Sequence, residues 1–323
     1  MLRAPWLLPC LAALVLAGLP LALSPYLLSL VAKIMVYAIF ALSLQLLVGT
    51  TGLVSLGHAA FLGIGAYVAV LAAPEGGLSL MWLLPAAMVA AAAYALVVGL
   101  LCLRTTGVYF IMVTLAFAQM AYFVFHDTKL AGGSDGLYLY TRPVLSVLGA
   151  TLLDAEDARQ LYALIWLALV GTYALLALLL RSRFGHALTG IRVNEQRMRA
   201  AGFSTLPYKL AAFVIAGALA GLAGGLLAVK DGVVNPELLS WHESGAVLLM
   251  LILGGLSSLR GAVVGALAFT LLKEFFSSEG LVGPLAAHWQ LSLGLSIIVL
   301  VAALPRGLMG LRDLKLMRGR PHV

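Results

Sequence analysis

The sequence predicts an all-α protein, a polytopic helical bundle that crosses a membrane with about nine to ten segments. Apolar residues make up 63% of the 323 positions and charged residues only 10%, whereas charged residues make up about 25% of a soluble domain. Apolar runs near the roughly 20 residues that a spanning helix needs follow one another from residue 7 to residue 306. We therefore expect residues 1–323 to form a single transmembrane domain, with no room for a soluble catalytic domain.

Charged residues, glycine and proline separate the apolar runs and so place the individual segments. The run 244–276 is too long for one segment, and a single helix there would leave the basic tail outside, against the positive-inside bias. We therefore expect two short helices that meet at residues 254–261. Lys33, one turn into its segment, is expected to extend its ammonium group to the membrane surface. The expected segments are residues 7–23, 28–48, 53–73, 78–103, 107–125, 161–180, 210–229, two within 244–276, and 285–304.

Two segments hold the excess of positive charge behind the net charge of +7. Residues 181–209 contain six basic residues and one acid, Glu195, and the tail 305–323 contains five basic residues and one acid. Short cytoplasmic segments are enriched in Lys and Arg, so we expect both segments and both termini on the cytoplasmic side. The basicity is an orientation signal in a protein surrounded by membrane lipid, and we expect no nucleic-acid partner.

The sequence lacks the common devices of enzymes. It contains no Gly-Lys dipeptide, hence no glycine-rich phosphate loop for ATP, and no His/Cys pair with metal-ligand spacing. We therefore expect no catalytic residue, no cofactor and no metal site. No Asp or Glu falls at the interior of a clearly bounded segment, which argues against a proton-driven secondary carrier. An ion-coupled secondary carrier and a non-transporting scaffold subunit remain the alternative classes.

Neutral polar and small residues inside the expected segments have two interpretations, as the wall of a solute path or as contacts between helices. Ser55 is expected on a small-residue face of segment 53–73, and His58 on the face away from it. The residues left open between a path and packing are Gln45, Ser55, Gly57, His58, Gly63, Thr114 and Gln119. Glycines spaced by four residues favour close packing against another helix, and these are Gly217, Gly221 and Gly225.

Residues 194–203 carry the signals of a short helix. Asn194 is a favoured N-cap, Glu195 suits the positive start of a helix, and Gly202 is a typical residue just beyond a helix end. The pattern predicts a helix over residues 195–201 within the basic loop 181–209. A helix this short is not stable alone in water, so it must dock on something. The loop is therefore either a solvated connector held by its neighbouring segments or a docking element for a partner.

Five motifs occur in order along the chain: GTTGLVSLGHAAFLGIGAYVAV from Gly49, GVYFIMVTLAFAQM from Gly107, AGGSDGL from Ala131, RSRFGHALTGIRVNEQRMRAAGFSTLPYKLAAFVIAGALAGLAGGL from Arg181, and LGGLSSLRGAVVGA from Leu253. Together they resemble the permeases of branched-chain amino acid ABC importers, and the LivM type more than the LivH type. The resemblance covers most of residues 32–304. It implies an ABC importer permease fold in the bacterial inner membrane.

The resemblance also implies function and partners. The chain would be a transport subunit without ATP hydrolysis of its own, paired with a LivH-type permease, two cytoplasmic ABC ATPases and a periplasmic solute-binding protein. Alternating access would be driven through residues 194–203 of the coupling loop 181–209. Similar permeases carry urea or short amides, so the solute stays open between these and branched-chain amino acids. The residues expected at the ATPase are Arg192, Asn194, Glu195, Arg197, Arg199, Ala200, Ala201 and Gly202.

Overall fold

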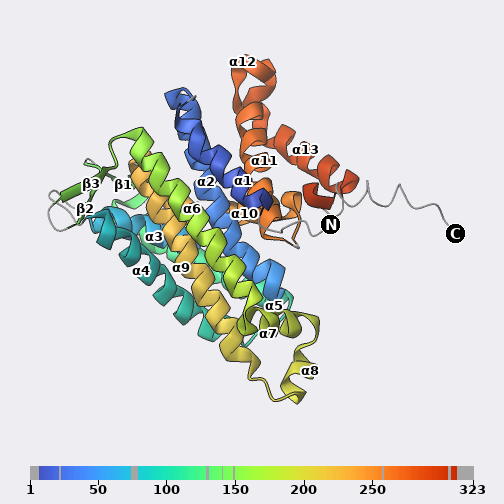
Figure 1. The fold of residues 1–323 in the computed structure, drawn as a ribbon. Helices are drawn as coiled ribbons and strands as arrows, with labels where there is room; N and C mark the ends of the chain where they lie inside the picture. The colour runs from blue at the N-terminus through green and yellow to red at the C-terminus, as the bar shows by residue number, and fades with distance from the viewer. Residues whose placement is uncertain are drawn as a thin grey trace.

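The computed structural model is a bundle of helices with two small pairs of strands (Figure 1). The helices are α1 (Leu7–Gly18), α2 (Pro25–Gln45), α3 (His58–Leu71), α4 (Leu80–Cys102), α5 (Val108–Asp127), α6 (Ala158–Arg181), α7 (Arg183–Val193), α8 (Glu195–Ala200), α9 (Thr205–Asp231), α10 (Trp241–Gly254), α11 (Leu259–Ser277), α12 (Glu279–Val282) and α13 (Trp289–Ala303). The residues described are 7–21, 23–73, 79–128, 131–139, 141–147, 150–256, 258–304 and 307–310. Most of the expected basic tail 305–323 lies outside them.

The strands lie beside one end of the long helices, away from the end where α7 and α8 project (Figure 1). One pair joins β1 (Leu137–Tyr138) to β4 (Val233–Val234), and the other joins β2 (Val144–Val147) to β3 (Ala150–Asp154). Both pairs are antiparallel. The β1–β4 pair connects the segment after α5 to the segment after α9, so it ties two distant parts of the chain together.

Six helical segments of the described chain are long and apolar enough to cross a membrane. They are Pro25–Thr51, Leu80–Cys102, Val108–Asp127, Ala158–Arg181, Thr205–Asp231 and Ala286–Gly310. Helices α10 and α11 are bent by 115° at a short break and would make a seventh span if they cross as one. The break expected at residues 254–261 is therefore present. The number of membrane segments reaches the ten expected only if each of the shorter helices α1, α3, α10 and α11 is counted as a separate segment.

Helix α9 lies in the middle of the bundle, and its main neighbours are α3 and α4. Small residues explain how closely these helices approach. A Cβ atom added to Gly221 would lie 2.5 Å from the Cβ atom of Ala91 on α4, and one added to Gly65 on α3 would lie 2.3 Å from the carbonyl oxygen of Gly221. Helix backbones can come this close only where side chains are absent or very short.

Two expectations about segment boundaries are wrong. Residues 181–209 are not mainly a loop, because they contain all of α7 and α8, and α9 already begins at Thr205. Ser182 makes the separate α7 possible, since its side chain accepts a hydrogen bond from the backbone of Gly185 and so caps the new helix. Pro207 falls in the first turn of α9, where the missing N–H is tolerated.

The second wrong boundary is the start of the segment expected at 53–73. A π-helical turn, Leu46–Thr51, extends α2 and ends at Gly52, whose φ of 75° breaks the helix. Helix α3 then starts only at His58. Ser55 therefore lies ahead of the helix and not on its small-residue face. Its hydroxyl accepts a hydrogen bond from the backbone N–H of Gly57 at 3.2 Å.

Candidate functional site

Helix α8 has the caps that its sequence predicts. The Asn194 side chain accepts a hydrogen bond from the backbone N–H of Arg197 at 2.9 Å. At the other end Gly202 has φ of 87°, and the N–H of Phe203 donates to the carbonyl of Met198 at 3.0 Å. This is the hydrogen-bond pattern of a Schellman motif. The short helix is thus fixed in length by residues on both sides of it.

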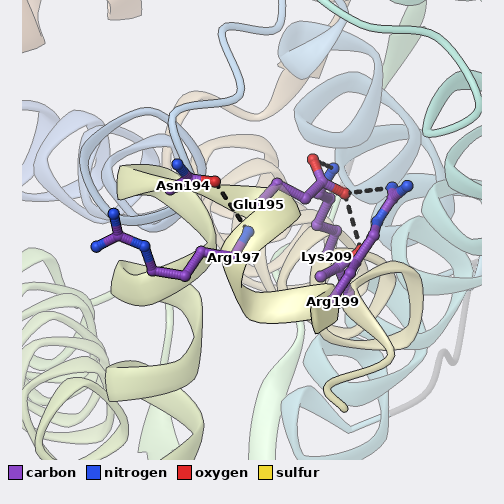
Figure 2. A network of polar contacts seen from close by, with 6 residues as sticks. Asn194, Glu195, Arg197, Arg199 and Lys209 are labelled. Atoms are coloured by element: carbon purple, nitrogen blue, oxygen red, sulfur yellow. Dashed lines mark hydrogen bonds and ion pairs between the residues drawn. The ribbon is translucent and has the colours of Figure 1, made fainter. Parts of the chain in front are cut away.

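Glu195, the first residue of α8, holds the helix to the start of α9 (Figure 2). Its Oε1 accepts hydrogen bonds from the Arg199 guanidinium at 2.6 Å and from the Thr205 hydroxyl at 2.8 Å. Its Oε2 accepts from the Lys209 ammonium at 2.6 Å. The Lys209 side chain is only 8% exposed, so Glu195 supplies the counter-charge for a buried cation.

The environment of Glu195 keeps its carboxylate ionised. Partial burial acts to raise its pKa, but the hydrogen bonds from Lys209, Thr205 and Arg199, with the charge of Lys209, outweigh that effect and lower the pKa to about 2. The carboxylate is therefore charged at every pH at which a cell lives. The Glu195–Lys209 pair therefore stays charged and joins α8 to α9 at all of these pH values.

Helix α7 is fastened to the rest of the chain as well. The Arg192 guanidinium donates to the carbonyl of Gly49, in the π-helical turn after α2. Phe184 stacks on Tyr208 of α9, with ring centroids 5.7 Å apart. We call residues 183–203 the α7–α8 unit. This unit projects from one end of the bundle (Figure 1), yet it is joined to both α2 and α9.

The outer surface of the α7–α8 unit is open. Val193 is 77% exposed and Phe203 is 40% exposed, although both are apolar. Among the described residues, the Arg197 guanidinium has no hydrogen-bond acceptor and no ion-pair partner, and it points away from Glu195 (Figure 2). The other members of the expected coupling set on this open surface are Ala200, Ala201 and Gly202.

The expected coupling residues therefore separate into two groups. Asn194 caps α8, while Arg192, Glu195 and Arg199 make bonds within the chain. Arg197 presents its charge outward. The sequence did not indicate this division, because the partners of the inward group, Gly49, Thr205 and Lys209, are up to 143 positions away.

His58 lies at the centre of a buried polar group in the bundle. Its ring has no exposed surface, and its Nε2 lies 2.7 Å from the Ser43 hydroxyl. The imidazole stacks on Phe40, with centroids 5.4 Å apart. The next residue, Ala59, donates its N–H to the Ser244 hydroxyl at 2.9 Å. These contacts join α2, α3 and α10 and leave no opening at His58.

Other residues left open between a path and packing lie against neighbouring backbone or side chains. A Cβ atom on Gly57 would lie 2.4 Å from the carbonyl oxygen of Thr114, and one on Gly63 would lie 2.3 Å from the side chain of Leu239. The Thr114 hydroxyl donates to the carbonyl of Ile111 within α5, at 2.9 Å. Each of these small or polar residues is enclosed by its neighbours.

Gln45 and the α9 glycines also lie at contacts between segments. The Gln45 amide donates to the carbonyl of Leu256, in the α10–α11 break, at 2.7 Å. On α9, Cβ atoms added at the three spaced positions would meet alanine side chains of α4 at 3.3 Å or less. The pairs are Gly217 with Ala95, Gly221 with Ala91, and Gly225 with Ala87.

Gln119 lies elsewhere, in the wall of a cavity of about 900 Å³ formed by α2, α5, α10, α11 and α13. We call this space the charged cavity, because charged side chains of both signs line it: Lys33 and Lys273, and Glu237, Glu243 and Glu274. Lys33, which the sequence predicts to extend towards the membrane surface, borders this cavity. The sequence feature that could have indicated this cavity is Lys273, a charged residue inside the apolar run 244–276. In the described part of the chain, no three His, Cys, Asp or Glu side chains come together to hold a metal ion.

The apolar helices that are long enough to span a membrane define the class of this protein as a multi-pass membrane protein. A family model for the permease component of the branched-chain amino acid transport system matches residues 26–304. The chain therefore belongs to this family of branched-chain amino acid transport permeases.

Individual relatives agree with the family and with its LivM type. The chain is 30% identical over 306 residues to the high-affinity branched-chain amino acid transport system permease protein LivM of Escherichia coli K12, covering 88% of this chain and 71% of the relative. LivM of Salmonella typhimurium is 30% identical over 307 residues, with the same coverage. LivH of Escherichia coli K12 is 25% identical over 289 residues, covering 85% of this chain and 91% of LivH. No solved structure matches the chain significantly. The LivM-type resemblance found in the sequence is confirmed.

Proposed function

We propose that this permease subunit imports branched-chain amino acids and is driven by partner ATPases that act on the α7–α8 unit. The complex would contain a LivH-type permease, two cytoplasmic ABC ATPases and a periplasmic solute-binding protein. The chain would lie in the bacterial inner membrane, with the α7–α8 unit and both termini in the cytoplasm. The family membership and the names of the LivM and LivH relatives support the solute class and the permease partner.

One observation carries the coupling proposal: α8 is held on one side and free on the other. On the held side, Glu195 joins α8 to Lys209 of α9 at 2.6 Å. On the free side, Arg197 and the exposed apolar side chain of Phe203 have room for a partner. A helix held in this way can be displaced by a bound partner and can transmit the displacement to the bundle. A solvated connector would not need the ion pair to α9.

The proposed mechanism follows from these contacts. Closure of the ATPase dimer displaces α8, and the Glu195–Lys209 pair transmits the displacement to the first turns of α9. Since α9 packs tightly on α3 and α4, the three helices move together. Their tilt closes the path towards the cytoplasm and opens it towards the binding protein. The expected role of Asn194, Ala200, Ala201 and Gly202 is to hold the shape of the docking element.

The test is reversal of the outward charge, Arg197→Glu, in the full complex reconstituted into liposomes. Placing a like charge at an interface costs several kcal/mol, so we expect leucine uptake and solute-stimulated ATP hydrolysis to fall by about tenfold or more. Arg104→Glu, the same change at an exposed residue after α4, is the matched control and should leave both rates near wild type. Wild-type uptake by Arg197→Glu would contradict docking through the free side of α8.

A further inference from the structure

The charged cavity contains both signs of charge at close quarters. Glu243, in the first turn of α10, is partly buried, and Lys273 and Lys33 lie near enough for their charges to act on it. The phenol of Tyr37 lies beside the same carboxylate. The Lys273 ammonium lies 5.3 Å from the centre of the Trp289 ring. Helix α2 and the consecutive helices α10 and α11 therefore bring opposite charges to one space.

These charges do not neutralise one another by direct contact. Among the described residues, none of Lys33, Glu243 and Lys273 belongs to an ion pair, although four ion pairs form elsewhere. Partly buried charges are unfavourable unless they are paired. An arrangement that keeps them separate is suited to an occupant that brings charges of its own.

The shape and apolar walls of the cavity limit what that occupant can be. Its volume of about 900 Å³ is in the range of small-molecule sites, roughly 300–1,000 Å³. Beside the charges, Phe269, Leu293 and Ile297 supply apolar walls. Urea and short amides are neutral and would leave the charges unpaired. A free α-amino acid with an aliphatic side chain carries an ammonium, a carboxylate and an apolar group, which match all three features.

We propose that the charged cavity is a site on the translocation path that binds the zwitterion of an aliphatic amino acid. The carboxylate of the solute lies at Lys273 and Lys33, its ammonium lies at Glu243, and its side chain packs on the apolar walls. The proposal rests on the proposed importer function and deepens it, because it makes this chain, in addition to the binding protein, select for zwitterions. Gln119 of the cavity wall then lies on the path, unlike His58.

Two tryptophans in the cavity wall, Trp241 and Trp289, provide the measurement. In the purified complex without binding protein, tryptophan fluorescence is titrated with leucine, with leucinamide (which lacks the carboxylate), with 4-methyl-2-oxopentanoate (which lacks the ammonium) and with urea. Each lost charge contact should weaken binding by about tenfold or more. We expect leucine to bind most tightly and urea to give no saturable change.

Single charge neutralisations then assign the two ends of the solute. Glu243→Gln should remove the preference for leucine over the oxo acid and keep the preference over leucinamide. Lys273→Met should do the reverse. Glu156→Gln and Arg104→Met, at exposed residues outside the cavity, remove charges of the same signs and serve as controls. Assembly with the partner subunits and basal ATP hydrolysis show that each variant is folded.

The outcomes separate this proposal from the importer function. Equal responses to leucine and urea, or wild-type leucine uptake by both Glu243→Gln and Lys273→Met, would overturn the charged site and leave the importer intact. Uptake that proceeds without the ATPases would overturn the importer function while the selectivity of the cavity stands. Arg197→Glu should lower uptake by about tenfold or more and keep the fluorescence response, since Arg197 lies outside the cavity.

Discussion

The middle of α9 and its first turns are held by opposite means. In the middle, backbone and alanine side chains meet without intervening atoms, so that a Cβ atom on Gly221 would come within 2.5 Å of Ala91. In the first turns, the buried ammonium of Lys209 is fixed by the carboxylate of Glu195. Close packing is short-ranged and tolerates no added volume, whereas a charge pair depends on protonation and on each partner.

The first turns of α9 can therefore be loosened independently of its middle. The α3–α4–α9 contact resists sliding, because its backbones already touch, and these three helices are a rigid group. The α8–α9 contact can be weakened one hydrogen bond at a time without altering that group. Changes in the middle of α9 should therefore affect stability, whereas smaller changes at its first turns should affect coupling.

The largest effect is expected from Gly221→Leu. The new side chain would meet Ala91 and the backbone of α4, and overpacking of this kind costs about 3 kcal/mol or more. We expect a large loss of folded, detergent-soluble protein and a clear fall in the thermal unfolding midpoint. Gly171→Leu on α6 is the matched control, since nothing lies within 4 Å of a Cβ atom there. Equal stability of the two variants would show that the small-residue contact is not tight.

A smaller and more local effect is expected from Glu195→Gln. The amide keeps the volume but removes the charge that balances Lys209, so the α8–α9 contact should weaken by about 1–2 kcal/mol, allowing for screening at the exposed Arg199. Hydrogen exchange in α8 should rise by about tenfold, while exchange in the middle of α9 stays unchanged. Glu279→Gln, at an exposed acid, is the control. Unchanged hydrogen exchange in α8 would show that Glu195 does not hold α8 to α9.

Acid should weaken the same contact without a mutation. The pKa of Glu195 lies at about 2 in the folded chain, below its ordinary value of 4.5, so folding favours the ionised form. Its contribution to stability is therefore complete above about pH 4.5 and is lost as the pH falls towards 2. A spin label on Arg197→Cys, with Cys10 and Cys102 replaced, should become more mobile over that interval. The same label combined with Glu195→Gln should show no such transition.

Local signals made α8 predictable from the sequence. Asn194 and Gly202 act on residues within a few positions of themselves, and the structure has both the cap and the Schellman hydrogen bonds. The spanning helices were predictable for a similar reason, because a helix that spans a membrane needs a long run of apolar residues, which is visible in the sequence. The late start of α3 was missed because the break at Gly52 depends on a π-helical turn, which apolar periodicity does not reveal.

The rest of the candidate sites depends on contacts between distant positions. In the sequence, Glu195 is simply an acid at the start of a helix. Only the fold brings Lys209 into contact with it. Lys33, Glu243 and Lys273 occur near the ends of three separate apolar segments, where each one has an ordinary interpretation. A single sequence contains no signal that they border one space. His58 appeared a candidate for a path because it is polar, yet its neighbours enclose it.

An effect similar in size to that of Glu195→Gln, but confined to the end of α8, is expected from Gly202→Val. With φ of 87° and nothing within 4 Å of an added Cβ atom, the cost is backbone strain alone, about 1–2 kcal/mol. We expect the last turn of α8 to fray, so that solute-stimulated ATP hydrolysis persists while uptake falls and insertion into the membrane is normal. Gly202→Asn is the matched control, because asparagine tolerates this conformation better than valine does. Its uptake should lie between that of the wild type and that of Gly202→Val. Wild-type uptake by Gly202→Val would mean that the shape of α8 does not matter for coupling, and that the charge of Arg197 acts without the helix that presents it.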